Sequence, residues 1–245
     1  MITHTQAIIL KSVDYQDSSK ILTVLSQKHG KIALIARGVK RPKSKLAGVI
    51  EIGNILDVVY YYKSSRSVQS LTEASINSGS LAFRSDFHKA AILYSVLEFS
   101  SQLIHENEEN SSLFNFLSTF ITWLAKVDSV DPSIFPYIQV RCAELLGFNI
   151  SFDEADTFNN MFFDISHGQV SQNYQTELSY KLTVKQSRFL HLAISSRSMS
   201  ILQLGLAGSE LKQLIHHLDV YYKYHIDGYQ DRKSDSIFDQ MLKDF

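Results

Sequence analysis

The period of the hydrophobic pattern changes near residue 80, and this change limits the possible folds more than any other feature of the sequence. Before that point, apolar and β-branched residues form short runs between turn residues, whereas after it they recur about every 3.6 residues. Short alternating runs are typical of strands, and a period of about 3.6 is typical of amphipathic helices. The sequence therefore predicts an α+β chain, with a β domain over residues 1–80 and a helical domain over residues 81–245.

The first part contains five runs that predict strands, at 7–13, 21–25, 32–36, 55–62 and 68–76. The turn Lys28-His29-Gly30 separates the second run from the third, and Gly30 tolerates the positive φ that a tight hairpin turn requires. Five short strands in so few residues are typical of a small closed barrel. We therefore expect an N-terminal five-stranded OB-fold barrel.

Capping signals divide the second part into helices. Asp131 followed by Pro132 has the form of an N-cap with proline at the first helical position. Thr183 with Gln186 has the spacing of a capping box. Residues 148–181 contain many Asn and Asp and no clear period, so we expect an irregular insertion there. The expected helices lie at 90–104, 113–124, 131–147, 183–194, 209–228 and after 234.

Charge is distributed unevenly between the two parts. Residues 1–80 contain 11 Lys and Arg against 5 Asp and Glu, although the whole chain has a formal net charge of −1. The remaining 165 residues contain 13 basic and 20 acidic side chains. Such asymmetry suggests a polyanion-binding module joined to a part with a different partner.

The strongest local signal for binding is a basic segment over residues 37–45, between the third and fourth predicted strands. Gly38 and Pro42 interrupt it, so we expect an exposed loop whose side chains follow a phosphate backbone. A solvated charged loop without a ligand is the alternative. The basic residues predicted to bind nucleic acid are Arg37, Lys40, Arg41, Lys43, Lys45, Lys11 and Lys20.

Tyrosines on the fourth predicted strand are candidates for stacking on bases. Alternation places Tyr60 and Tyr62 on one side of the strand and Tyr61 on the other, so part of this group must be exposed. Tyr15 is a similar but weaker candidate. The pattern predicts base stacking by Tyr60 and Tyr62, with core packing as the alternative.

The sequence lacks the motifs of the common enzyme classes. The segment Gly38–Ser44 resembles a phosphate-binding P-loop, but its second glycine is missing and Pro42 removes one backbone N–H donor. His216, His217 and His225 do not have the spacing of about four residues that a helical metal site needs. We therefore expect no catalytic residue, no bound metal and no cofactor.

Cys142 is the only cysteine, so the chain has neither an internal disulfide nor a cysteine-based zinc site. It lies within an apolar helical pattern, which favours core packing. The apolar run over residues 7–10 has no basic leader, and nowhere do about 18 apolar residues run together. These features predict a cytoplasmic protein that does not insert into a membrane.

Several short segments, spread along nearly the whole chain, occur in an order and spacing that can be compared with known families. They are Ala7-Ile8-Ile9-Leu10, Tyr15-Gln16-Asp17-Ser18-Ser19-Lys20-Ile21-Leu22-Thr23, Gly30, Ala36-Arg37-Gly38-Val39, Lys43-Ser44, Leu71-Thr72-Glu73-Ala74, the helix around 91–98, Leu145-Leu146-Gly147-Phe148, and Tyr221-Tyr222-Lys223-Tyr224-His225-Ile226-Asp227-Gly228 followed by Lys233-Ser234. In order and spacing these segments resemble the RecO family of DNA repair and recombination mediators.

The resemblance implies an OB-fold domain that binds single-stranded and double-stranded DNA and anneals complementary strands, followed by a helical domain. It also implies that the protein is nucleoid-associated and acts by binding alone, without a covalent step. The implied partners are RecR and, in many bacteria, RecF, with which the protein loads RecA onto DNA covered by the single-stranded-DNA-binding protein. The resemblance further implies that the protein recognises the acidic C-terminal tail of that DNA-binding protein. Two alternatives stay open, an OB-fold RNA-binding scaffold and a metal-dependent nucleic-acid enzyme.

One departure from the family concerns zinc. Many relatives carry four cysteines after the segment that matches Gly147-Phe148, and this chain has none there. Phe158, Phe162 and Phe163 are available as an apolar plug in place of the metal. Zinc-dependent stabilisation is therefore not expected.

The helical part is the expected place for protein partners. An apolar groove flanked by bases would accept an acidic peptide that ends in an aromatic residue. The alternative for each base is a solvated surface charge. The candidate flanking bases are Arg84, Lys89, Lys126 and Arg141.

Overall fold

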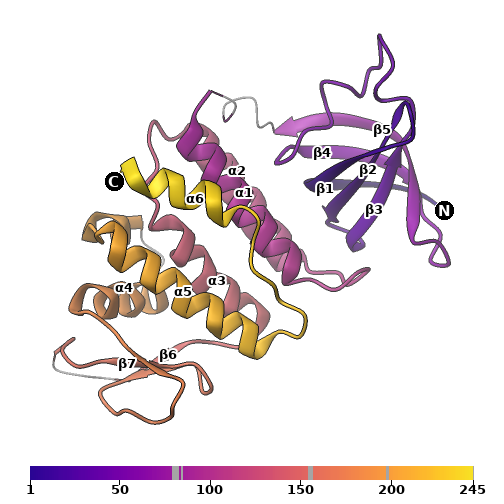
Figure 1. The fold of residues 1–245 in the computed structure, drawn as a ribbon. Helices are drawn as coiled ribbons and strands as arrows, with labels where there is room; N and C mark the ends of the chain where they lie inside the picture. The colour runs from indigo at the N-terminus through magenta and orange to yellow at the C-terminus, as the bar shows by residue number, and fades with distance from the viewer. Residues whose placement is uncertain (79–82, 84, 154–156, 197–198, 245) are drawn as a thin grey trace. The chain divides into compact units, whose positions relative to one another are not determined.

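The computed structural model describes residues 1–78, 83, 85–153, 157–196 and 199–244 (Figure 1). The chain divides into two compact units, Met1–Ser129 and Val130–Phe245. The first unit contains β1 (Ile2–Tyr15), β2 (Ser19–Ser26), β3 (Gly30–Ala36), β4 (Ile55–Tyr61), β5 (Val68–Ser78), α1 (Phe87–Gln102) and α2 (Ser111–Lys126). The second contains α3 (Ile134–Leu146), β6 (Ser151–Phe152), β7 (Phe162–Asp164), β8 (Gln169–Ser171), β9 (Ser179–Lys181), α4 (Val184–Ser195), η2 (Met199–Leu204), α5 (Gly208–His225), α6 (Asp235–Met241) and η3 (Leu242–Asp244).

The five predicted strands form a closed barrel in the order β1-β2-β3-β5-β4. β1 pairs antiparallel with both β2 and β4, which closes the sheet, and β3 pairs parallel with β5. The β2–β3 hairpin predicted at Lys28-His29-Gly30 is confirmed, because Ser26 pairs with Gly30 and Gly30 has a φ of 62°. The OB-fold barrel and the α+β class predicted from the sequence are both confirmed.

Alternation along each strand builds the core of the barrel. Leu22 and Val24 on β2, and Leu34 on β3, point inward and are almost fully buried, whereas the residues between them point outward. Val39 and Ile50 come from the segment between β3 and β4 and are buried in the same cluster. This segment therefore closes one end of the barrel.

The first two helices pack with the barrel. Asp86 and Asn110 cap them, because their side chains accept hydrogen bonds from the amides of Lys89 and Leu113. The turn between the helices contacts β3, where the amide of Asn107 donates to the carbonyl of Lys31 at 2.9 Å. Lys31 Nζ in turn donates to the carbonyl of Ser101 at 2.8 Å. The first compact unit thus extends beyond residue 80, where the hydrophobic period changes. The division of the chain into two functional domains at residue 80 stays a prediction.

Close backbone contact explains the glycine of the β2–β3 turn. A Cβ atom on Gly30 would lie only 1.7 Å from the carbonyl oxygen of Glu108, in the turn between α1 and α2. The positive φ of Gly30 also disfavours any side chain. Glycine at this position therefore lets the hairpin both turn and pack against the helices.

The insertion predicted as irregular contains a small sheet in the order β6-β8-β7-β9. Its strands are two or three residues long, which is too short for a period to be visible in the sequence. Phe163 on β7 is fully buried, whereas Phe158 and Phe162 are only half-buried. Phe163 is therefore the one of the three proposed plug residues that occupies the core.

A buried carboxylate holds the turn of this sheet. Asp164 accepts hydrogen bonds from Ser166 Oγ at 2.6 Å, the His167 amide at 3.1 Å and Thr176 Oγ1 at 3.1 Å. Burial alone would raise the pKa of Asp164, but these hydrogen bonds outweigh it and lower the pKa to about 2. The side chain therefore stays ionised and ties β7 to the segment before β9.

Most of the expected helix boundaries are confirmed within one or two residues. The capping box of Thr183 and Gln186 is present at the start of α4. The start of α3 was predicted too early, since the helix begins at Ile134 and the Asp131 side chain instead accepts from the Ser133 amide at 2.8 Å. Asp131 thus caps the turn before the helix rather than the helix itself.

Candidate nucleic-acid interface

The basic loop, residues 37–45, is exposed at the surface of the barrel. All five of its basic side chains are exposed, as predicted. Successive turns shape the loop, with the Arg41 amide donating to the Gly38 carbonyl and the Ser44 amide to the Arg41 carbonyl, both at 3.1 Å. Val39 is 3% exposed and anchors the loop in the barrel core. A buried apolar anchor thus holds a row of cations at the surface.

Lys40 is engaged with the barrel. Its Nζ lies 2.9 Å from Asp14 Oδ2, and its amide donates to the carbonyl of Ser18 at 3.0 Å. The hydrogen bond from Lys40 lowers the pKa of Asp14, and the charge of Lys20 acts in the same direction. Because Asp14 offsets one nearby cation, Lys40 is less available to a phosphate than Arg41, Lys43 or Lys45.

Lys11 and Lys20 lie on opposite sides of the β1–β2 ribbon. Lys11 pairs with Thr23, and Thr23 with Ala33. Lys20 pairs with Asp14 and Ala36, and Ala36 belongs to the barrel core. Only Lys20 therefore lies on the side of the ribbon where Lys40 binds Asp14.

Tyr60 is buried in the barrel core, and the prediction that it stacks on bases is corrected. It is 0% exposed, and its hydroxyl lies 3.3 Å from Ser26 Oγ and 2.6 Å from His29 Nδ1. A ring enclosed on both faces has no surface for a base. Alternation along β4 was read correctly, but Tyr60 points into the barrel and Tyr61 is the exposed neighbour.

Tyr62 is half-buried and stacks on His29, with ring centroids 3.8 Å apart and planes 3° apart. It lies where β1 begins, since its amide donates to the carbonyl of Met1. The basic loop is bound at the other end of β1, next to Asp14 and Ser18. The structure thus does not bring Tyr62 and the basic loop together.

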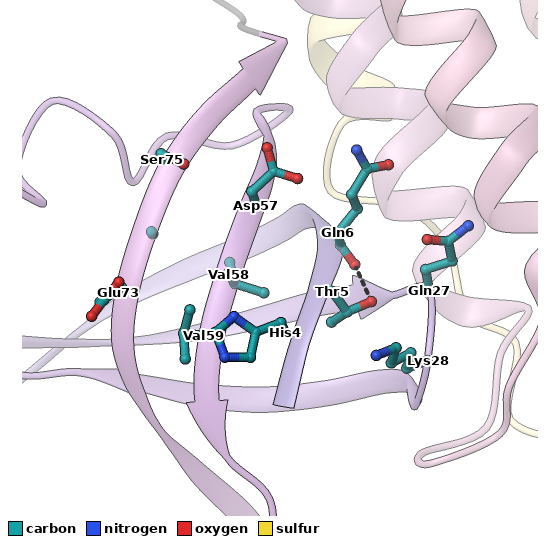
Figure 2. Close-up of a pocket in the computed structure, with 11 residues that line it drawn as sticks. His4, Thr5, Gln6, Gln27, Lys28, Asp57, Val58, Val59, Glu73 and Ser75 are labelled. Carbon is teal, nitrogen blue, oxygen red and sulfur yellow. Dashed lines mark hydrogen bonds between the residues drawn. The ribbon is translucent and has the colours of Figure 1, made fainter. Parts of the chain in front are cut away.

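A groove of about 400 Å³ on the outer face of β1, β4 and β5 escaped the sequence analysis (Figure 2). Figure 2 shows Asp57 on β4 and Glu73 on β5, with His4, Gln6 and Lys28 among the other lining residues. Two carboxylates repel phosphate, so this groove does not continue the basic surface. The signal for it in the sequence was Asp57, a charged residue between apolar neighbours on β4.

The four bases proposed for partner binding have different environments. Lys89 is 7% exposed and its ammonium donates to the carbonyl of Val127. Arg141 is 7% exposed and forms an ion pair with Glu144. Neither is free to flank a groove, which corrects that prediction, whereas Lys126 is exposed. Arg84 lies outside the described residues.

A second groove, of about 420 Å³, lies in the second unit. It is bounded by the C-terminal turns of α3 and α4 and by the segment that leads into β6. Apolar side chains from these elements provide much of its lining, and Glu144 and Asn149 contribute polar groups. The lining residues are Val140, Glu144, Asn149, Ile150, Ser151, Phe152 and Ile194.

The histidine and cysteine side chains were considered in the sequence as possible metal ligands, and the structure shows the surroundings of each. Among the residues that the structure describes, no three His, Cys, Asp or Glu side chains gather as a metal site would require. Cys142 is fully buried, which confirms its predicted place in the core, and burial raises the pKa of its thiol. His217 is 3% exposed, whereas His225 is exposed and its Nε2 donates to the Ile165 carbonyl oxygen at 2.9 Å.

Sequence comparison matches both parts of the chain to known proteins. Residues 1–79 match the family model described as "Recombination protein O N terminal", and residues 84–235 match "Recombination protein O C terminal". The chain belongs to the RecO family. It is therefore a DNA repair and recombination mediator, as the resemblance implied.

Some relatives of this RecO-family chain match nearly its whole length. It is 28% identical over 261 residues to the DNA repair protein RecO of Chloroherpeton thalassium, which covers 99% of this chain and 100% of the relative. It is 28% identical over 260 residues to that of Chlorobium limicola, covering 99% of both. No helix among the described residues is both long enough and apolar enough to span a bilayer.

Proposed function

We propose that this RecO-family protein binds single-stranded and double-stranded DNA through the basic loop and anneals complementary strands. The observation that carries the proposal is the exposed row of cations held at one end of the barrel by buried Val39. Contacts of this kind neutralise phosphates without reading sequence. Such contacts serve single-stranded and duplex DNA alike, and complementary single strands that are gathered in this way can then anneal.

The test uses the release of counterions. Each phosphate neutralised on single-stranded DNA contributes roughly −0.7 to the slope of log affinity against log salt. The double variant Arg41→Ala with Lys45→Ala should therefore flatten this slope by about 1.4 and weaken binding to unrelated sequences alike. Both side chains are exposed, so the fold should be retained.

Lys63→Ala with Arg66→Ala is the matched control. It removes the same charge from exposed residues between β4 and β5, at the end of the barrel where Tyr62 meets Met1. Equal losses in the two double variants would show that net charge, rather than the basic loop, drives binding. Comparison of DNA with RNA of the same sequence distinguishes the RNA-binding alternative, because a preference for RNA requires contact with the 2′-hydroxyl.

We further propose that the protein works with RecR, in many bacteria RecF, and the acidic tail of the single-stranded-DNA-binding protein to load RecA at the nucleoid. Support for these partners comes from membership of the RecO family. The helical part remains the proposed place for the tail, with exposed Lys126 as the remaining described candidate base. Binding of each purified partner to the full chain, measured separately, tests this assignment.

A further inference from the structure

The strand β5 extends past the end of its neighbour β3. Within the described part of the chain, β3 pairs with β5 at residues 68–70, whereas β4 pairs with β5 over residues 70–78. No other described strand pairs with residues 72–77 on the side where β3 lies. We call residues 72–77 the free edge. Its backbone groups that point away from β4 are available to another strand.

The turn at the start of the basic loop explains why β3 does not continue along β5. The strand β3 ends at Ala36, and Gly38 then has a φ of 68°. The chain turns toward the β1–β2 ribbon, where the amide of Lys40 donates to the carbonyl of Ser18 at 3.0 Å. The basic loop therefore does not extend the sheet along the free edge.

An apolar strip of the free edge is exposed on the side that faces the barrel core. Ile76 pairs with Leu56, which is a buried residue of the core. Ala74 pairs in the same way with the core residue Val58. Residues that pair directly share a face of the sheet, so Ile76 and Ala74 point to the core side. Ile76 is nevertheless 41% exposed, and Ala74 is only half-buried.

The other side of the free edge is polar. Glu73 and Ser75 line the groove of Figure 2, in which Asp57 lies on the neighbouring strand β4. Asn77 points to this side as well, because its Nδ2 donates to Asp57 Oδ2 at 3.0 Å. Glu73 is the only charged residue of the six in the free edge. The free edge thus combines one carboxylate, polar side chains and an uncovered apolar strip.

We propose that the free edge binds the free edge of a second copy of this chain. The two strands pair antiparallel, with Ser75 opposite the partner's Ser75. Such pairing extends the sheet of one barrel into the next and gives partners to the backbone groups of both edges. A two-fold axis at this point makes the two halves of the contact identical.

The free edge is complementary to itself in this register. Ile76 lies opposite the partner's Ala74, so that a large and a small apolar side chain cover each other on the core side. Glu73 lies opposite the partner's Asn77, whose amide has a second N–H for the carboxylate. No two charged side chains lie directly opposite each other, and each favourable pair occurs twice. A second copy therefore satisfies the edge with the residues that the edge itself carries.

The dimer has a consequence for annealing, which rests on the proposed function. Ile35 pairs with Ser70, so the basic loop leaves β3 beside the start of the free edge. Two copies joined at their free edges hold two basic loops in one assembly, and each loop binds one DNA strand. Complementary strands held in this way have a high effective concentration for each other, which speeds annealing.

Sedimentation velocity of the full chain over a concentration series tests the contact. The wild type should form a dimer as the concentration rises. Ile76→Lys should weaken the dimer by about tenfold or more, because an ammonium group would be buried among apolar side chains. Ile2→Lys is the matched control, since Ile2 is 54% exposed on β1 and lies outside the free edge. This control should dimerise as the wild type does.

A disulfide tests the register. Ser75→Cys places two thiols opposite each other, with Cβ atoms about 5 Å apart, so mild oxidation should link the two copies. Cys142 is fully buried and does not compete. Ser65→Cys, at an exposed position in the turn between β4 and β5, measures linkage by random collision. Linkage of Ser75→Cys no greater than that of Ser65→Cys overturns the proposal, whether or not Ile76→Lys folds.

The remaining outcomes separate this inference from the proposed function. A wild type that is monomeric at every concentration, or a dimer that Ile76→Lys leaves unchanged, overturns the proposed contact. Ile76→Lys should bind one short DNA strand as Ile2→Lys does but anneal complementary strands more slowly. Normal annealing by monomeric Ile76→Lys overturns the role of the dimer in annealing. Failure of the dimeric wild type to bind DNA contradicts the proposed function and leaves the contact standing.

Discussion

At the scale of single residues, Tyr60 shows how a polar group is accommodated within an apolar barrel. Its ring fills the core, while its hydroxyl is placed between Ser26 Oγ and His29 Nδ1. Burial raises the pKa of this hydroxyl, so it stays protonated. The residue therefore joins β4 to the β2–β3 turn by both packing and hydrogen bonding.

Tyr60→Phe tests this structural role. The substitution keeps the ring but removes the hydroxyl, which leaves the two polar partners without it, and we expect a loss of about 1–2 kcal/mol in the free energy of unfolding. Urea denaturation measures the loss. DNA affinity should not change, because Tyr60 has no exposed surface. A selective loss of DNA binding with unchanged stability would contradict the assignment of Tyr60 to the core.

At the scale of elements, α5 packs a neutral histidine against the small sheet. The ring of His217 on α5 lies 4.6 Å from that of Tyr180 on β9, between centroids. Its Nδ1 is buried and has no hydrogen-bond partner among the described residues. Burial, assisted by the neighbouring His216, lowers the pKa of His217 to about 4.

This contact predicts a dependence of stability on pH. An unfolded histidine has a pKa near 6.5, so the unfolded chain binds more protons than the folded chain between about pH 6.5 and 4. Stability from this site is present above that window and falls as the pH is lowered through it. The expected loss is about 2 kcal/mol between pH 8 and pH 5.

His217→Phe should remove this component, because phenylalanine fills the site without titrating. Chemical denaturation at pH 8 and pH 5 measures the difference between the variant and the wild type. His216→Gln is the control, since His216 is exposed and the variant keeps the ring of His217 together with burial, the larger cause of its lowered pKa. Equal pH dependence in His217→Phe and the wild type would show that His217 is not the group responsible.

At the scale of the whole molecule, the division into two compact units predicts a selective effect of DNA on stability. The basic loop lies in Met1–Ser129. Ligand that binds only the folded form stabilises that unit by about 2.7 kcal/mol at one hundred times its dissociation constant. We expect calorimetry to show that oligothymidine raises the unfolding temperature of the first unit more than that of the second.

Two variants assign the transitions. Tyr60→Phe should lower the transition that responds to DNA, whereas His217→Phe should change the pH dependence of the other, since His217 lies in Val130–Phe245. An equal rise of both transitions on addition of DNA would contradict a binding site confined to the first unit.

The local pattern determined much of the architecture. Period-two alternation was sufficient for five strands, because one side of each strand must be apolar to fill the barrel. The Thr183 capping box and the single Cys142 were likewise readable, since both depend on near neighbours or on composition. The exposed basic loop followed from charge and turn residues, because several adjacent cations cannot be buried without partners.

Other features depended on contacts between residues far apart in the chain. Alternation showed that Tyr60 and Tyr61 face opposite ways, but only closure of the barrel decided that Tyr60 points inward. Lys89 could not be distinguished from a solvated base in the sequence, because the carbonyl that it binds belongs to Val127, 38 residues away. The sequence by itself thus determined the elements and the uneven charge, whereas tertiary structure decided which side chains are exposed, because burial and ion pairing are set by neighbours that strand register and helix packing bring together.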